Sequence, residues 1–368
     1  MLIKKNLVNI PGWRTKKRII VIESDDWGSV RMPSKEVYNI LLSARIPVNQ
    51  HYFAKNDCLE SEEDLLALFE LLSAYRDESG NHPVITANAV VANPDFEKMK
   101  NAGLDNYYYE KITETYEKYP NHKHVIELWK EYGIEKKMLW PQFHGREHLN
   151  VRYWMKTIRS GAISEKIAFD NKAILGVNVP GEPKQYYNYM AAFEYDSISH
   201  MKEIEAITRD GLELFYQLFG YYSKTFVASC AVQGEHLDHV LKEGGVDFHQ
   251  CGQQFRPQGE GKYKIVNKLW GQKNKVGQIY WRRNCIFEPS RKPDYDCADH
   301  CLAEINTAFR WGKPAVINAH RVNFMGGIWP ENRENSLRQL SVLLRTILLK
   351  WPDVEFMTSG QLGEVISK

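Results

Sequence analysis

Residues 18–29 read RIIVIESDDWGS, and two adjacent aspartates, Asp25 and Asp26, follow the apolar run in this stretch. Four consecutive apolar residues bounded by polar ones are typical of a buried β-strand. Two neighbouring carboxylates repel one another and are costly to desolvate unless a cation or a proton lies between them. The pair therefore indicates either a binding site at the end of this strand or a turn or helix cap made of ordinary carboxylates.

Short apolar runs alternate with amphipathic segments along the rest of the chain. The apolar runs predict strands, and the segments with apolar residues at helical spacing predict helices. The predicted strands are residues 18–24, 83–91, 137–145, 224–232, 246–251, 277–287, 314–320 and 354–358. The predicted helices are residues 33–46, 61–76, 124–133, 200–219, 235–245, 296–312, 334–351 and 359–367, with Ser34 and Ser61 as the caps of the first two.

This repeated βα order predicts an α/β fold in which helices surround a parallel sheet, either open or closed into a barrel. No Pro/Ser-rich linker divides the 368 residues. We therefore expect a single domain over residues 1–368, with insertions near residues 93–135, 160–190 and 252–275.

The composition narrows the class of partner. Lys and Arg number 48 against 46 acidic residues, and a formal charge of +2 predicts no nucleic-acid partner. No run of 18 apolar residues predicts a membrane span, and the N-terminal segment has no signal-peptide pattern. The six cysteines are scattered along the chain, and this distribution is more typical of reduced thiols than of a disulfide framework. We therefore expect a cytoplasmic protein. The oligomeric state stays open.

Three sets of ionisable residues follow predicted strands. These are the aspartate pair, then His144 and His148 in QFHGREHLN, and finally His320 after PAVINA. The carboxyl ends of parallel strands share one edge of a sheet, where active sites of such folds lie. Two histidines four residues apart share one face of a helical turn and could join a carboxylate in a metal site. The alternatives are a solvated histidine pair and a buried structural role for His320.

Glu147 gives the same stretch a second interpretation. The order H-x-x-E-H matches the inverted zinc-protease signature, in which the glutamate is a general base. That signature belongs on a regular helix, whereas this motif directly follows a strand and contains Gly145. We therefore favour the metal site over the protease interpretation.

Three stretches resemble motifs of the polysaccharide deacetylase superfamily, the carbohydrate esterase family 4 type. They are ESDDWGS (23–29), FHGREH (143–148) and PAVINAH (314–320), and they resemble the T-F-D-D, H-[ST]-x-x-H and L-x-H motifs of its chitooligosaccharide deacetylase homology domain. Gly145 replaces the usual Ser or Thr. The resemblance implies a distorted (β/α)7 TIM-like barrel.

The resemblance also implies roles for individual residues. Asp26, His144 and His148 would bind a divalent metal, with zinc expected first and cobalt, nickel, iron or manganese as alternatives. Asp25 would be the general base, and His320 would be the general acid that protonates the leaving amine. The implied substrate is a carbohydrate that carries an N-acetyl group.

Two family motifs are missing from the expected places. The third motif, R-x-P-[YF], should lie near residues 224–235, which contain neither Arg nor Pro. Orientation of Asp25 would then require Arg31, Arg282 or Arg283. The fourth motif pairs a Trp with an Asp that tunes the acid histidine, and YWRRNCIFEPS supplies only Trp281.

Further residues are expected to bind the substrate because of their type and position. Trp27 directly follows the aspartate pair and could stack on a sugar ring, and Trp329 lies in a Gly-containing loop after His320. Trp129 and Trp154 are expected in the core. The predicted substrate-binding residues are Trp27, Glu147, Arg283, Arg321 and Trp329.

The sequence thus predicts a metal-dependent hydrolase that removes an acetyl group from an N-acetylated sugar or polysaccharide precursor. A second interpretation is another metal-dependent hydrolase on the same barrel, a glycosidase or a non-sugar amidase, with Glu147 or Glu194 as acid or base. A third is a carbohydrate-binding relative without turnover.

Overall fold

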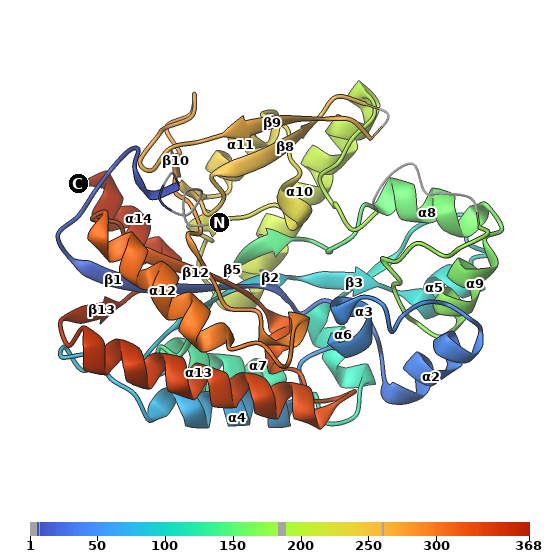
Figure 1. Cartoon of the computed structure of the whole chain (residues 1–368). Coiled ribbons are helices and arrows are strands. Elements are labelled where there is room, and N and C mark those ends of the chain that lie inside the picture. The colour runs from blue at the N-terminus through green and yellow to red at the C-terminus, as the bar shows by residue number, and fades with distance from the viewer. Residues whose placement is uncertain (1–5, 7, 183–188, 260) are drawn as a thin grey trace.

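The computed structural model describes residues 6, 8–182, 189–259 and 261–368 of the chain. Its main feature is a curled parallel sheet in the order β10-β7-β6-β5-β2-β1-β12-β11, and β13 pairs with the first half of β1 (Figure 1). The strands are β1 (Arg18–Trp27), β2 (Ile85–Val90), β5 (Leu139–Gly145), β6 (Thr225–Phe226), β7 (Phe248–His249), β10 (Ile279–Tyr280), β11 (Cys285–Ile286), β12 (Ala315–His320) and β13 (Val354–Phe356).

The prediction of a single strand over residues 277–287 is wrong, because this stretch forms two short strands, β10 and β11. β10 pairs with β7 and β11 pairs with β12, so the two short strands form opposite ends of the sheet. Residues 281–284 connect them and limit the distance between the two edges to at most about 18 Å. If β10 and β11 are counted as the two halves of one strand position, the sheet has seven strand positions and forms a distorted TIM-like barrel. This confirms the predicted fold class. We call the place where β10 and β11 meet without pairing the seam of the barrel.

Helices cover the outside of the sheet, as the βα order predicts. Figure 1 shows α4 and α13 lying together below the sheet, with α8 and α9 gathered at its right. The helices are α2 (Lys35–Ser43), α3 (Tyr52–Asn56), α4 (Glu62–Ser73), α5 (Phe96–Asn101), α6 (Ile112–Lys118), α7 (Val125–Leu128), α8 (Val151–Arg159), α9 (Ile163–Asp170), α10 (Ile198–Phe219), α11 (Leu237–Glu243), α12 (Cys297–Arg310), α13 (Pro330–Lys350) and α14 (Ser359–Ser367).

The predicted caps of the first helices are confirmed. Ser34 accepts a hydrogen bond from the Val37 N–H at the start of α2. Ser61 and Asp64 form a reciprocal capping box at the start of α4. The predicted helix over 124–133 instead divides into α7 and the π-helix η1 (Trp129–Glu135).

The predicted strand over 224–232 is much shorter in the structure, because β6 ends at Phe226. Cys230 and Ala231 have φ angles of 55° and 56°, in the left-handed region that strands do not use. They form part of the 3-10 turn η2 (Ser229–Ala231). Two further 3-10 turns, η3 (Pro289–Arg291) and η4 (Arg321–Phe324), follow β11 and β12.

Two antiparallel hairpins lie in segments predicted as insertions. β3 (Ala92–Pro94) pairs with β4 (Tyr109–Lys111), and β8 (Gln253–Pro257) pairs with β9 (Tyr263–Asn267). Parts of the predicted insertions 160–190 and 252–275, namely residues 183–188 and 260, lie outside the described residues.

The core lies between the sheet and its helices. Trp129 and Trp154 are almost completely buried, which confirms their predicted core positions. None of the six cysteines, all of which lie among the described residues, forms a disulfide. Among the described helices, none is long and apolar enough to cross a membrane.

Candidate metal centre

The aspartate pair lies at the carboxyl end of β1, where the strand is irregular. The register between β1 and β2 shifts between Ser24 and Trp27, and Asp26 has a φ of 77°. A bulge re-aims the side chains of a strand, and aspartate tolerates the left-handed region better than most residues. Asp25 lies opposite His320 in the ladder with β12, while Asp26 turns toward β5. The two adjacent carboxylates therefore have different neighbours: Asp25 lies beside β12, and Asp26 lies beside His144 and His148.

His144 is the penultimate residue of β5, and His148 lies in the bend between β5 and α8. The two imidazoles therefore do not share the face of a helical turn, and that local prediction is wrong. Gly145, with a φ of 142°, lets the chain reverse directly after His144. The reversal brings the two rings to a centroid distance of 5.3 Å.

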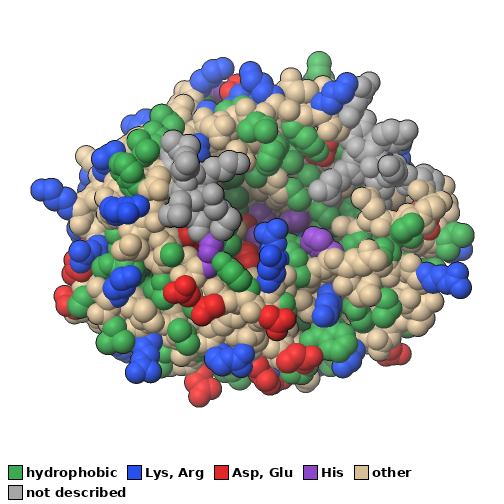
Figure 2. Space-filling view, in the orientation of Figure 1, with side chains coloured by type: hydrophobic (Ala, Val, Ile, Leu, Met, Phe, Trp, Pro, Cys, Tyr) green, Lys and Arg blue, Asp and Glu red, His purple; other side chains and the backbone are tan. Residues whose placement is uncertain are grey.

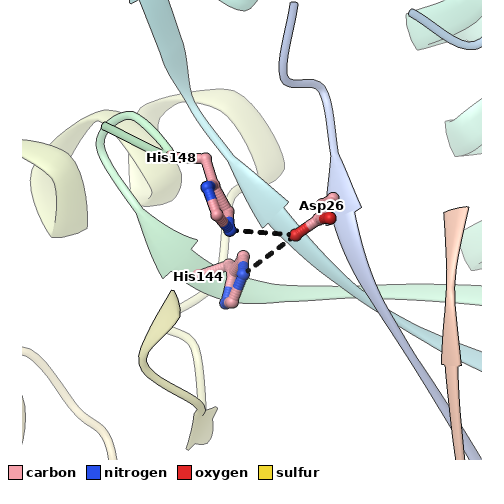
Figure 3. A group of neighbouring side chains, drawn as sticks. All are labelled: Asp26, His144 and His148. Carbon is pink, nitrogen blue, oxygen red and sulfur yellow. Dashed lines mark ion pairs between the residues drawn. The ribbon is translucent and has the colours of Figure 1, made fainter. Parts of the chain in front are cut away.

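Both histidines converge on one oxygen of Asp26, as Figure 3 shows. The Nε2 atoms of His144 and His148 lie 3.5 Å and 3.0 Å from Asp26 Oδ1. One ligand atom from each residue lies within 4.8 Å of the other two. All three side chains are buried. Among the described residues, this is the one cluster of at least three His, Cys, Asp or Glu side chains with such a spacing.

The hydrogen bonds of His144 favour a bound cation. Its Nδ1 lies 2.8 Å from the Val227 carbonyl oxygen, which can only accept, so Nδ1 carries the proton. Nε2 then presents a lone pair toward Asp26, and this buried atom has no hydrogen-bond partner. A histidine ligand that donates its other N–H to a backbone carbonyl is the usual arrangement in metal sites. The residues therefore fit a divalent ion.

The charge states also suit metal ligands. Burial alone would raise the pKa of Asp26, but His148 and His144 outweigh it and hold the pKa well below its ordinary range. Burial lowers the pKa of His148 despite the nearby Asp26 carboxylate. An ionised aspartate and a neutral histidine are the forms that bind a cation.

Asp25 is held by an arginine from the seam of the barrel. The Arg283 Nη1 and Nη2 atoms donate to Asp25 Oδ2 and Oδ1 at 2.6 Å and 2.8 Å, and Asn88 donates to Oδ1 at 2.7 Å. Burial would raise the pKa of Asp25, but Arg283 outweighs it and lowers the pKa to about 2. Arg283 therefore orients Asp25, the role that the sequence left open among three arginines. Arg282 instead donates to the carbonyl of Lys268.

His320 completes the group from β12. Its Nε2 lies 4.0 Å from Asp25 Oδ2, and its Nδ1 is in close contact with Glu288 Oε1. Burial lowers the pKa of His320, but the Glu288 carboxylate outweighs it and raises the pKa to about 9. Asn323 fixes the second oxygen of Glu288 through a hydrogen bond of 2.9 Å.

Glu288 is the main residue that the sequence reasoning missed. It lies in CIFEPS, within the stretch searched for an acid that tunes the late histidine, but as a glutamate seven residues after Trp281. Gln250 was also missed, and it accepts from both Arg283 and Asn88 at the end of β7. The signal for both was their position directly after a strand of the parallel sheet.

Trp27 does not lie where a sugar could stack on it, which corrects that prediction. Its side chain is fully buried. The indole N–H donates to Ser24 Oγ at 2.9 Å, and the ring packs against Trp129 and Phe324. The bulge in β1 turns this residue into the core.

The other predicted substrate-binding residues have partners away from the candidate ligands. Glu147 Oε1 accepts from Arg146 and Tyr107 at 2.8 Å and 2.9 Å. Arg321 is fully buried between Asp57 and Glu60.

Trp329 donates from its indole N–H to the Lys55 carbonyl, and its ring packs against Tyr38. Glu194, the other glutamate considered as an acid or base, accepts from the Tyr263 hydroxyl at 2.7 Å. Of the five predicted substrate-binding residues, Arg283 is the one whose side chain pairs with Asp25.

One face of the molecule is concave. Figure 2 shows a face hollowed near its middle, with histidine side chains in and beside the hollow. The His320 side chain is 23% exposed, so this histidine is reached by solvent.

No protein-family model matches this chain, and no curated protein matches it. A protein provisionally assigned as a polysaccharide deacetylase, from Mycobacterium smegmatis, is 12% identical over 97% of this chain and 93% of its own, with a TM-score of 0.41. A 4-alpha-glucanotransferase from Thermococcus litoralis is 10% identical over 94% of this chain and 40% of its own, with a TM-score of 0.44.

A third structure, also provisionally assigned as a polysaccharide deacetylase, comes from Pseudomonas aeruginosa PAO1. It is 8% identical over 95% of this chain and 89% of its own, with a TM-score of 0.43.

Proposed function

We propose that this chain is a metal-dependent hydrolase that removes an acetyl group from an N-acetylated sugar or polysaccharide precursor. The observation that carries the proposal is the site itself, in which an Asp-His-His cluster lies beside an Asp-Arg pair and a His-Glu pair. The cluster fits a divalent ion, with zinc expected first because two histidines and one carboxylate with open positions are typical of catalytic zinc. Such an ion acts as a Lewis acid that acidifies water and polarises a carbonyl.

Asp25 and His320 supply the base and the acid. At neutral pH Asp25 is ionised, because its pKa is about 2, and His320 is protonated, because its pKa is about 9. Asp25 can therefore take a proton from the attacking water, and His320 Nε2 can donate one to the departing nitrogen. Two neighbouring groups whose environments push their pKa values apart are typical of an acid–base pair.

Arg283 and Glu288 keep these two groups in their working states. Arg283 binds both oxygens of Asp25, which fixes the carboxylate and keeps it ionised. Glu288 fixes the ring of His320 through Nδ1, which leaves Nε2 as the atom that faces Asp25. Both supporting residues come from the chain around β11.

The site favours amide hydrolysis over glycoside hydrolysis. Hydrolysis of a glycosidic bond requires one carboxylic acid that stays protonated until it reaches the leaving oxygen. Asp25 and Asp26 both have lowered pKa values, so neither suits that role. Burial raises the pKa of Glu147 and of Glu194, but Glu147 pairs with Arg146 and Tyr107, and Glu194 accepts from Tyr263. The protonated group beside Asp25 is a histidine, which suits an amine leaving group.

The proposal is tested by metal content and product analysis together. Elemental mass spectrometry of the wild type should find about one divalent ion per chain, and the His144→Ala/His148→Ala double variant should lose it. Acetate release from a panel of N-acetylated sugars should accompany the metal. A new reducing end without acetate would indicate a glycosidase. A wild type that stays metal-free after reconstitution would overturn the proposal.

A further inference from the structure

The two oxygens of the Asp26 carboxylate face different partners. Oδ1 faces the Nε2 atoms of His144 and His148, whereas Oδ2 lies 3.6 Å from the Nη2 atom of Arg31. Arg31 is only 7% exposed. Burial of a guanidinium has a high desolvation cost, and beside a candidate metal ligand its charge would repel a cation. The position of Arg31 therefore needs a physical explanation.

Arg31 is fixed from several sides. Its Nε lies 3.1 Å from Asp57 Oδ2 as an ion pair, and its guanidinium lies 4.9 Å from the centre of the Phe53 ring. Its carbonyl oxygen accepts from the Ile174 N–H at 3.0 Å. The side chain therefore bridges Asp26 and Asp57 in one defined place.

A second buried pair holds Asp57 in turn. Arg321 donates to Asp57 Oδ1 from Nε and Nη2 at 3.2 Å and 2.9 Å, and from Nη1 to Glu60 Oε2 at 2.8 Å. Glu60 Oε1 accepts from the backbone N–H of Gly28 at 2.9 Å. Asp57, Glu60 and Arg321 have no exposed surface.

These contacts form a closed circuit that begins at Asp26 and returns to the backbone two residues later, at Gly28. Positive and negative groups alternate along it, so each charge has a partner on both sides. Such a circuit leaves Arg31 little freedom to move away from Asp26 Oδ2. It also explains why Arg321, predicted to bind substrate, lies in the interior.

A carboxylate can bind a metal with one oxygen or with both. A guanidinium at one oxygen competes with the metal for that oxygen and leaves the other as the ligand. We propose that Arg31 is a positioning residue that restricts Asp26 to a single ligand oxygen, Oδ1, and so keeps the coordination number of the bound ion low. This inference rests on the proposed function, because it requires the divalent ion.

Cobalt(II) tests the inference, because its visible absorption weakens as its coordination number rises. The wild type, Arg31→Met and Arg31→Lys are loaded with cobalt to saturation, and bound metal is counted by elemental analysis. Arg31→Met removes the charge and the two nitrogens that form ion pairs with Asp26 and Asp57, so Asp26 Oδ2 can join the ion and the visible band should lose intensity. Lysine keeps the charge but replaces the guanidinium, which faces Asp26 with Nη2 and Asp57 with Nε, by a single ammonium nitrogen, so its band should be intermediate.

Arg18→Met is the matched control. Arg18 begins the same strand, β1, at its opposite end and forms an exposed ion pair with Asp353. This variant loses the same charge and should keep the wild-type spectrum. A wild-type spectrum in folded Arg31→Met would overturn the inference, and if that variant fails to fold, a wild-type spectrum in Arg31→Lys has the same meaning. A wild type that binds no cobalt would instead overturn the proposed function.

Discussion

The contact between Glu288 and His320 gives the sharpest prediction. Glu288→Gln keeps the shape of the side chain but removes the charge that raises the pKa of His320 to about 9. Burial then opposes only the more weakly acting Asp26 and Asp25 carboxylates, so the pKa of His320 should fall toward its ordinary value of 6.5. A fall from about 9 to 6.5 corresponds to about 3 kcal/mol of lost stabilisation of the charged ring.

The direct measurement is an NMR titration of the histidine ring protons in metal-free protein, with His320→Gln to assign the resonance. Wild-type His320 should titrate near pH 9, and the variant should titrate at least about two pH units lower. Glu127→Gln is the matched control, because Glu127 pairs with His124 on the surface, where both side chains are about 70% exposed. The titration of His320 should stay near pH 9 in that variant.

Stability provides an independent check, with a defined sign. The folded pKa of His320 lies above its unfolded value, so its contribution is fully present below pH 6.5 and is lost as the pH rises through 9. Urea unfolding should therefore show Glu288→Gln destabilised by up to about 3 kcal/mol more at pH 6 than at pH 10. An unchanged His320 titration in the variant, or a wild-type value near 6.5, would refute the reasoning.

Four further predictions concern the same site. Asp26→Asn should lose the divalent ion, which elemental mass spectrometry would detect, since a neutral amide is a poor ligand; full occupancy would contradict the ligand assignment. Asp25→Asn should keep the ion but lose roughly 10²- to 10⁴-fold in kcat for acetate release, and near-normal turnover would exclude it as the base. In Arg283→Lys the pKa of Asp25 should rise from about 2, so the acid limb of the kcat/KM profile should move to higher pH; an unmoved limb would mean that another group keeps Asp25 ionised. Trp27→Ala should destabilise the fold by about 3–5 kcal/mol in urea unfolding, and a raised KM without that loss would restore a role in binding.

The order of predicted elements was sufficient to predict a parallel sheet surrounded by helices and to bring together its main ionisable groups, and the family resemblance implied that the sheet closes into a barrel. Each of Asp25, His144 and His320 follows an apolar run, and the carboxyl ends of parallel strands necessarily meet at one edge. That rule requires no knowledge of side-chain directions. It therefore held although His144 and His148 do not lie on a helix.

The directions in which side chains point could not be predicted from the sequence. Trp27 follows the aspartates in the chain, but a bulge with a left-handed Asp26 turns it inward, and no local pattern reveals a bulge. The stretch 277–287 has the hydrophobic pattern of one strand, although it forms two strands that pair with different neighbours. Hydrophobic periodicity indicates which residues are buried, but it does not indicate with which strand a segment pairs. Arg283 and Glu288 lie around that change, so their roles became visible only in three dimensions.

The seam between β10 and β11 has a consequence for how the molecule loses activity on heating. Arg283 lies on the connector between the two strands and belongs to neither ladder. Local unfolding of this connector would break the hydrogen bonds between the Arg283 guanidinium and Asp25. Regions with few ladder bonds open before the whole domain does. Inactivation should therefore begin some degrees below the melting temperature, together with faster amide hydrogen exchange at Arg282 and Arg283 than at Trp281 and Asn284, whose N–H groups donate to His249 and Val316. A cross-link across the seam should delay the inactivation.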